Sequence, residues 1–472
     1  MRTLGLLVVV AASVLLLPAP ASASRSMWSV FEDHNALVRT TPAKRQRALE
    51  QIRLHMGADT LRIEIKWNEV APLPSRRSKP AFDATNPAAY PGFFPYDDLI
   101  LRARSLGMRI IVTITGDAPR WATAGGRGRS FATANYKVNS GEYSRFAGAV
   151  ARRYSGRFGG LPAVHYFTVW NEPNHRNFLK PTSQAPRIYR NLVDAALPAI
   201  KRNGPSGVRI FVGELAPVGR APIAMGPKEF LRKWLCLNRR LRRTSSGSGC
   251  RRFKRIDAHG FAHHPYGPTE RVPRKRDVIN MLAIRTLATY LDRARRAKRF
   301  TRKLNIYNTE FGLQSNPPDR LVSTSLSRQA ALINEKEEYA YRYSRLKSHS
   351  QYLLYDDPAR PGSLRTKWSG FQTGLRFADG RRKSAYNAYR FPIVVKKRGK
   401  KGVSIWGRVR PGSGARSVQL QKGGRNSGPR VKTNSLGYFG ANRAKAGSYR
   451  FKAYDKDGLL LGTSRTAKAI AG

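Results

Sequence analysis

Cysteine is scarce in this chain of 472 residues, which contains only Cys236 and Cys250. There is no Cys-x-x-Cys, and the eight histidines include the adjacent pair His263 and His264 but no His-Glu-x-x-His. These absences argue against a thiol redox role and a metal cluster, so we expect neither metal nor cofactor. In an oxidising compartment the two cysteines are expected to form a disulfide that closes the loop between them.

Long apolar runs are absent beyond the N-terminus. The run from Leu4 to Leu17 follows Arg2 and precedes an Ala-x-Ala sequence ending at Ala23, which is typical of a secretory signal peptide. It is too short to span a bilayer, and no later stretch approaches the roughly 20 apolar residues of a membrane helix. We therefore expect residues 1–23 to be a signal peptide and the protein to be secreted, without a transmembrane segment. An uncleaved anchor is the alternative.

Acidic residues are also few, since 29 Asp and Glu face 87 Lys and Arg, a formal net charge of +58. Such a charge predicts attraction to polyanions. Residues 393–472 hold 19 Lys and Arg against 2 Asp, a net of +17, and are about twice as basic per residue as the rest. The alternative is a compositional bias that needs no ligand. No nucleic-acid motif accompanies the charge, so no specific nucleic-acid partner is expected.

Apolar segments rich in β-branched residues alternate with amphipathic helical patterns such as Glu142–Tyr154. Eight such strands in alternation with helices predict an α/β fold, a closed (β/α)8 TIM barrel over residues 24–392. The expected strands are Met27–Phe31, Thr60–Lys66, Arg109–Thr115, Val164–Trp170, Val208–Gly213, Ile256–Ala262, Leu304–Thr309 and Gln351–Tyr355.

Two of these strands end in a glutamate. Asn171-Glu172-Pro173 follows the fourth strand, and Glu310 follows the seventh, 138 residues later. In a barrel the C-terminal ends of all strands meet at one rim. Two carboxylates that approach one place from different elements are what cleavage of a glycosidic bond requires. The alternative is that both are ordinary strand-end glutamates.

The strand Thr60–Lys66 is expected to place charges inside the barrel. Its period of two directs Arg62, Glu64 and Lys66 toward the axis and the residues between them toward the helices. Charges in a barrel interior are costly unless paired, which favours a functional network. The alternative is a structural pair between Arg62 and Glu64.

Aromatic residues near strand ends favour a carbohydrate cleft, because the C–H faces of sugars pack on flat rings. Each of them is more often a core residue when taken alone, Trp67 above all. The candidates are Trp67, Trp121, Trp170, Tyr266 and Trp368.

The segments around Glu172 and Glu310 resemble the catalytic motifs of the large clan of retaining glycoside hydrolases built on TIM barrels. The resemblance covers about Met27 to Phe391, and Leu61–Trp121 looks most like the β-xylosidase, iduronidase and exopolysaccharide-hydrolase family. It implies that Glu172 is the general acid/base and Glu310 the nucleophile.

The same resemblance implies further roles around the sugar. Arg62 would keep the nucleophile ionised, Asn171 would bond the sugar 2-hydroxyl, and the phenol of Tyr266 in the sequence His264-Pro265-Tyr266 would bond the nucleophile. Trp121 would border the sugar. The eighth strand lacks the tryptophan of the clan, for which Trp368 is a possible substitute. These residues, with His264, form the expected substrate-binding set.

A small β-sandwich is expected over residues 393–472. Short alternating segments separated by Gly, Pro and Asn predict antiparallel strands at Val403–Val409, Ser417–Gln421, Ser448–Tyr454 and Leu459–Ser464. The basic run Lys396–Lys401 is expected to mark the domain boundary. The segment resembles sandwich modules of secreted hydrolases, which either bind glycans or brace the catalytic domain.

Two functions are compatible with these patterns. The first is a secreted retaining glycosidase acting on a polymeric or cell-surface carbohydrate, with the basic C-terminal domain attached to an anionic wall or surface polymer. The alternative is a secreted basic protein with an inactive barrel, held to nucleic acid or acidic wall polymer by its charge.

Overall fold

The computed structural model describes residues 26–124, 135–247, 249–267, 277–322, 324–412 and 416–471. The expected signal peptide lies outside these ranges. Within them, no helix combines the length and apolar character needed to cross a membrane.

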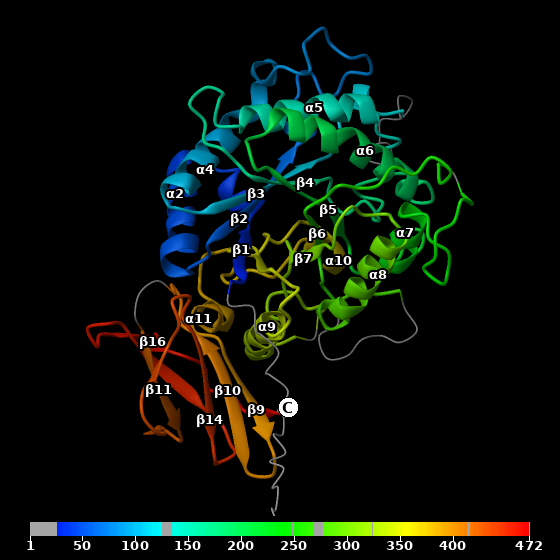
Figure 1. Ribbon diagram of the computed structural model, residues 1–472. Coiled ribbons are helices and arrows are strands. Elements are labelled where there is room, and N and C mark those ends of the chain that lie inside the picture. Colours follow the sequence, from blue (N-terminus) through cyan, green and yellow to red (C-terminus); the bar gives the residue numbers. More distant parts are fainter. Residues whose placement is uncertain are drawn as a thin grey trace, which may run out of the picture.

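Eight parallel strands form a nearly closed barrel, in the order β7-β6-β5-β4-β3-β2-β1-β8 (Figure 1). A parallel bridge between Ile306 and Leu346 links the two end strands of this order at their beginnings. The fold is therefore a TIM barrel, as the alternation of strands and helices predicts. The strands are β1 Trp28–Glu32, β2 Thr60–Lys66, β3 Arg109–Thr115, β4 Tyr166–Val169, β5 Arg209–Leu215, β6 Gly260–His263, β7 Asn305–Asn308 and β8 Ser348–Tyr352.

Helices surround the barrel and follow the strands along the chain. The longest are α5, α6 and α9, and an apolar core between helices and strands fixes their positions. The helices are α1 His34–Leu37, α2 Pro42–Glu50, α3 Trp67–Val70, α4 Phe94–Ser105, α5 Ser140–Arg153, α6 Ala185–Asn203, α7 Pro227–Trp234, α8 Ile284–Arg296, α9 Leu326–Tyr341, α10 Leu364–Lys367 and α11 Ser384–Arg390.

The expected bounds of β2 and β3 are confirmed, whereas those of β6 and β8 are wrong by several residues. Before β6, Ile256 makes only an isolated bridge to Phe300 and does not extend the strand. Strand β8 lies earlier than expected because Ser348–Tyr352 pairs with β1, and Leu353, with φ of 73°, ends the strand.

The barrel interior changes from apolar to polar along its axis. Five buried residues, one from each of five strands, form an apolar floor: Val30, Ile111, Phe211, Ala262 and Tyr307. Nearer the C-terminal rim, Thr168 and Thr113 share a hydrogen bond of 2.9 Å, and Arg62 is buried. The predicted alternation of β2 is confirmed, since Leu61, Ile63 and Ile65 lie in the outer core.

The C-terminal segment forms two sheets over a core of its own, antiparallel except for the parallel pairing of β17 with β9. Its first strand carries part of the basic run Lys396–Lys401. The run therefore forms the exposed end of the β9–β10 hairpin, and the expectation that it marks a domain boundary is wrong. The strands are β9 Ile393–Arg398, β10 Gly402–Arg408, β14 Tyr438–Arg443 and β17 Ala469–Ile470 in one sheet, and β11 Ser417–Lys422, β12 Arg425–Asn426, β13 Val431–Lys432, β15 Arg450–Tyr454 and β16 Leu460–Thr463 in the other.

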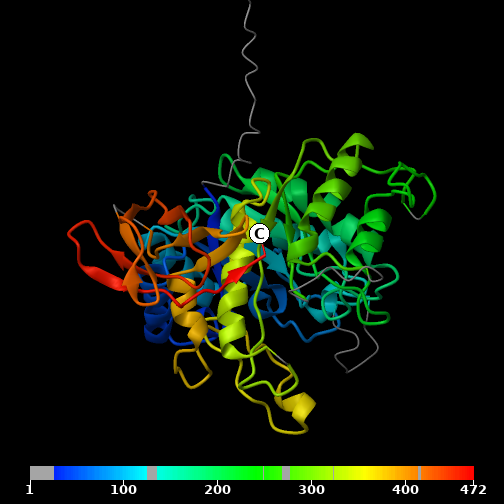
Figure 2. The same ribbon diagram turned by 90° about the horizontal axis from the view of Figure 1, so that it is seen from below.

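A buried ion pair joins the sandwich to the barrel. Glu337 of α9 accepts hydrogen bonds from Arg410 at 2.6 Å and Arg408 at 3.3 Å, and both guanidinium groups also donate to the Ser29 hydroxyl of β1. Burial raises the pKa of Glu337, but Arg410 and Arg408 outweigh it and hold the pKa below its usual value. In both views the sandwich, orange to red, lies beside α9 (Figures 1 and 2). Since Ser29 is near the start of β1, the sandwich docks at the barrel end opposite the C-terminal rim.

Candidate active site

The structure brings Glu172 and Glu310 together at the C-terminal rim. One carboxylate oxygen of each and a ring nitrogen of His264 all lie within 4.8 Å of one another. Glu172 follows β4 with φ of 36°, and its backbone N–H donates to the Glu214 carbonyl at 2.9 Å. This hydrogen bond to the end of β5 fixes the backbone position from which the Glu172 side chain extends.

Two donors hold the Glu310 carboxylate. The Tyr266 hydroxyl donates to Oε1 at 2.8 Å, and Arg62 Nη1 donates to Oε2 at 3.1 Å. Burial raises the pKa of Glu310, while the charges of His264 and Arg62 lower it, and the pKa stays above the ordinary value. Both donors nonetheless favour the ionised form and orient it toward Glu172.

Arg62 is the centre of a larger network than the sequence predicts. Besides Glu310 it donates to Glu32 at 2.5 Å, Glu214 at 2.9 Å and the Asn171 side-chain oxygen at 2.8 Å. The expected ion pair between Arg62 and Glu64 is present at 3.5 Å, but Glu64 is only one of four carboxylate neighbours of Arg62. A guanidinium with this many acceptors fixes residues from four strands in one geometry.

Glu214 is a site residue that the sequence reading missed. It is fully buried, and its Oε2 accepts hydrogen bonds from His264 at 2.5 Å, Arg62 at 2.9 Å and Thr309 at 3.1 Å. Burial raises the pKa of Glu214, but Arg62 and His264 outweigh burial and hold it at about 2. Glu214 is therefore an anion at neutral pH, beneath the two rim glutamates.

A β-bulge explains why Glu214 was missed. Phe211 faces the interior and Val212 the outer core, so strict alternation would turn Glu214 outward. The register shifts between Gly213 and Leu215, Glu214 takes φ of 47°, and the side chain enters the barrel. A glycine inside a strand, directly before an acid, is the sequence signal of such a bulge.

His264 links three carboxylates. Its Nδ1 lies 3.0 Å from Glu172 Oε1 and 3.5 Å from Glu310 Oε2, and its Nε2 contacts Glu214. Burial lowers the pKa of His264, but Glu310, Glu172 and Glu214 raise it to about 10. At neutral pH the ring is therefore an imidazolium that donates from both nitrogens. The group of Glu172, His264 and Glu310 has metal-compatible spacing, and an ion bound there would have to displace the proton from His264 Nδ1.

Two of the expected aromatic platforms belong to the core. Trp67 and Trp170 are fully buried, with Trp67 stacked on Phe146 at 5.0 Å and Trp170 packed edge-on against Tyr143 at 5.3 Å. The expectation that these two tryptophans face a sugar is therefore wrong. They pack beneath α5 because a large ring contributes more free energy of folding when it is buried than when it lies at the exposed rim.

The remaining tryptophans stay candidates. Trp121 is 9% exposed and contacts Trp67 and Phe82, while half-buried Trp368 lies against the Lys367 ammonium group. The loop after β8 brings a different ring close to Glu310.

That ring is Phe371, whose side chain is 41% exposed. It packs on Tyr352 at 5.2 Å and on Tyr266 at 6.4 Å. Phe371 and Tyr352 form ring surface beside Glu310 that the sequence does not identify, because only a tryptophan, Trp368, is expected to follow the eighth strand.

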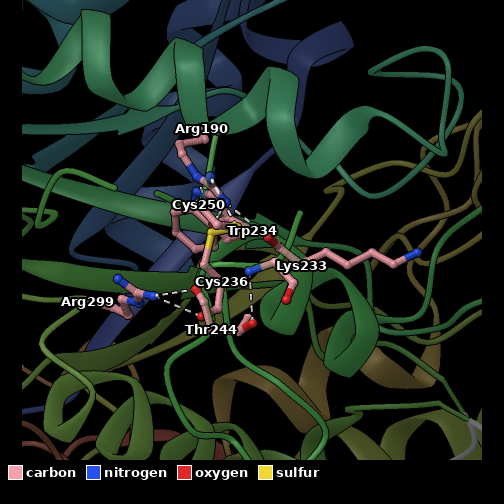
Figure 3. The surroundings of a disulfide bond; sticks show 8 residues. Arg190, Lys233, Trp234, Cys236, Thr244, Cys250 and Arg299 are labelled. Atoms are coloured by element: carbon pink, nitrogen blue, oxygen red, sulfur yellow. Dashed lines mark hydrogen bonds between the residues drawn. A yellow bond between two sulfur atoms is a disulfide. The ribbon is translucent and has the colours of Figure 1, made fainter. Parts of the chain in front are cut away.

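The expected disulfide between Cys236 and Cys250 is confirmed. It lies in the loop between α7 and β6 (Figure 3).

Comparison with solved structures shows a shared fold. A glucosidase from Croceicoccus marinus is 12% identical, with 91% of this chain and 95% of the other covered at a TM-score of 0.52. A family 39 glycoside hydrolase from Bacteroides cellulosilyticus WH2 is 14% identical, with 90% and 80% covered at a TM-score of 0.50. No protein-family model and no curated protein matches the sequence. The chain thus shares its barrel architecture with glycoside hydrolases at very low sequence identity.

Proposed function

We propose that the protein is a retaining glycoside hydrolase with Glu172 as acid/base and Glu310 as nucleophile. The observation that carries the proposal is the approach of the two carboxylates, whose nearest oxygens lie within 4.8 Å. Retaining enzymes place their carboxyl groups about 5 to 5.5 Å apart, whereas inverting enzymes leave about 6.5 to 9.5 Å for a water molecule. The names of the two structural neighbours support the same reaction class.

The proposed reaction is a double displacement. Glu310 attacks the anomeric carbon as the glycosidic C–O bond breaks, and the Glu172 proton passes to the leaving oxygen. Water then attacks the glycosyl-Glu310 ester, Glu172 accepts its proton, and the Glu310 carboxylate is released.

Neighbouring residues position these two groups. Tyr266 and Arg62 hold Glu310 from two sides. Arg62 also occupies the Asn171 side-chain oxygen, which leaves the Asn171 amide hydrogens for the sugar 2-hydroxyl. His264 places a positive charge between both glutamates, so that it tunes the proton affinity of each.

Substitutions of the two glutamates should have different effects on activity, because the proposed roles differ chemically. Glu310→Gln should abolish turnover of every glycoside, because no other carboxylate can form the ester. Glu172→Ala should retain activity on aryl glycosides with good leaving groups and regain activity with azide, because only poor leaving groups need the proton. Asp457→Asn, at a surface pair with Lys456 in the sandwich, is the matched control. Equal loss on activated and unactivated substrates would contradict the role of Glu172, and an inverted anomeric product by NMR would contradict retention.

Secretion and attachment to an anionic wall or surface polymer are part of the same proposal. The exposed basic residues at the β9–β10 hairpin tip are suited to contact a polyanion in a salt-dependent manner. Replacing Lys397, Lys400 and Lys401 by Gln should weaken retention on an acidic polymer at low salt and leave hydrolysis of a small aryl glycoside unchanged. Equal retention of both proteins across salt concentrations would show that this charge has no such role.

A further inference from the structure

A basic cavity of about 550 Å³ lies beside the disulfide, between the start of α6 and the end of α7. None of its described lining residues is acidic, and four are cationic: Arg187, Arg190, Arg232 and Lys233. The other lining residues include the hydroxyl groups of Ser183, Thr244 and Ser246. Cations and hydroxyl donors together form a lining suited to an oxyanion.

Arg190 carries a buried charge in this lining. It is 5% exposed, and its acceptors are the backbone carbonyls of Lys233 and Trp234, with the Cys250 sulfur 3.9 Å from Nη1. Burial lowers its pKa to about 10 despite attraction from Asp194. In the described chain no carboxylate comes within ion-pair distance of Arg190, which is unusual for a buried guanidinium.

A second buried arginine adds to the local positive field. Arg299 is 3% exposed and donates to the Cys236 and Thr244 carbonyls on the other side of the disulfide (Figure 3). Arg190 and Arg299 both lie over the Phe253 ring, at 5.0 and 4.4 Å. As with Arg190, no ion pair to Arg299 is found within the described ranges, and Asp194 attracts Arg190 only from beyond ion-pair distance.

The other cations of the lining have solvent access. Arg187 is exposed and Arg232 half-buried, and the described part of the chain gives neither a carboxylate partner. Lys233 lines both this cavity and a neighbouring one, and it pairs at 2.6 Å with Glu229, which lines the neighbouring cavity. Arg187 and Arg232 are thus free to approach a ligand.

We propose that this cavity binds a phosphate or sulfate ester group. Guanidinium groups bind such tetrahedral oxyanions through paired N–H donors, and the buried Arg190 supplies a fixed charge at low solvent exposure. Its volume far exceeds that of a free ion, so the group is carried on a larger molecule.

The neighbouring cavity indicates in which direction the rest of the bound molecule extends. It has a volume of about 610 Å³, shares Ser183 and Lys233 with the basic cavity, and is lined in part by Glu229 and Asp277, which disfavour an anion there. It reaches Ala224, which bridges to His175, three residues after Glu172. The ester group therefore lies in the basic cavity, and the rest of the ligand extends toward the rim.

Calorimetric titration with inorganic phosphate, inorganic sulfate and acetate, at constant ionic strength set by sodium chloride, tests the site. Arg187→Gln/Arg232→Gln removes two charges from the lining. Arg239→Gln/Arg240→Gln removes two exposed charges that lie in the loop closed by the disulfide and do not line the cavity. Neither pair includes a residue of the proposed catalytic site, so the outcome is independent of glycosidase activity.

We expect saturable binding of phosphate or sulfate near one equivalent in the original protein and in the Arg239/Arg240 variant. Affinity should fall about tenfold or more in the Arg187/Arg232 variant, because two of the charges that face the anion are lost. The stronger of the phosphate and sulfate responses identifies the ester class. Equal affinity in the two variants, binding of acetate as tight as either ion, or no saturable binding would overturn the proposal.

Discussion

Replacing Glu214 by Gln removes the anion beneath the proposed catalytic pair with little change in shape. Glu214 is fully buried and accepts from Arg62, His264 and Thr309 through one oxygen. Gln keeps an acceptor there, but it offers no charge to the two cations. The expected result is a large loss of stability that depends on pH.

The magnitude follows from proton linkage. The pKa of Glu214 is about 2 in the folded protein against an ordinary 4.5, and each tenfold difference in proton affinity corresponds to about 1.4 kcal/mol. The Glu214 charge therefore contributes roughly 3 kcal/mol above pH 4.5. Because the folded pKa is depressed, this contribution is lost as pH falls toward 2, and less than half remains at about pH 3.

Urea denaturation at pH 6 and pH 3 measures the difference in the free energy of unfolding between the original protein and Glu214→Gln. Glu214→Gln should be less stable by roughly 3 kcal/mol at pH 6, and the gap should narrow markedly at pH 3. Glu229→Gln is the control, because its exposed pair with Lys233 is expected to contribute at most about 1 kcal/mol. A Glu214→Gln protein as stable as the original at pH 6, or a gap that does not change with pH, would refute the reasoning.

Three further changes test other parts of the structure. Glu337→Gln should lower the free energy of unfolding by about 3 kcal/mol, because Arg408 and Arg410 lose their buried counter-ion, and an unchanged thermal midpoint would argue against this docking. Replacing both cysteines by Ser should cost about 3 kcal/mol in the loop-entropy model and remove any effect of dithiothreitol on the melting temperature, whereas an unchanged midpoint would contradict the expectation. Tyr266→Phe should lower kcat/KM about tenfold or more, because Glu310 loses a hydrogen-bond donor to its ionised form. For the same reason the acidic limb of the pH profile of kcat/KM should move to higher pH. An acidic limb that does not move would show that Tyr266 does not influence the ionisation of Glu310.

The sequence predicts those parts of the fold that rest on local pattern. The alternation in Thr60–Lys66 identifies the inward charge of Arg62, and the apolar strand before Asn171 identifies the rim position of Glu172. Both follow from side-chain periodicity and from the common direction of parallel strands.

Parts that depend on local irregularity or on contacts distant in sequence were not predictable in this way. Glu214 enters the site through a bulge, which breaks the period of two. Trp67 packs against α5 in the core, and Phe371, for which no role was expected, lies beside Tyr266, because these contacts are decided only by the folded chain. The Lys396–Lys401 run has linker-like composition, yet Ile393 and Val395 before it are buried and continue into a strand.

The position of the sandwich determines how the molecule would be oriented on any surface. Arg408 and Arg410 attach the sandwich beneath the start of β1, while Glu172 and Glu310 open at the other end of the barrel. A protein held through the β9–β10 tip would thus present its rim outward, toward the medium. The polymer to which the protein binds would then differ from the carbohydrate that it is proposed to cleave, unless another polymer molecule folds back over the rim. Binding to the surface would therefore keep the protein at that surface, where its rim meets carbohydrate that arrives from solution.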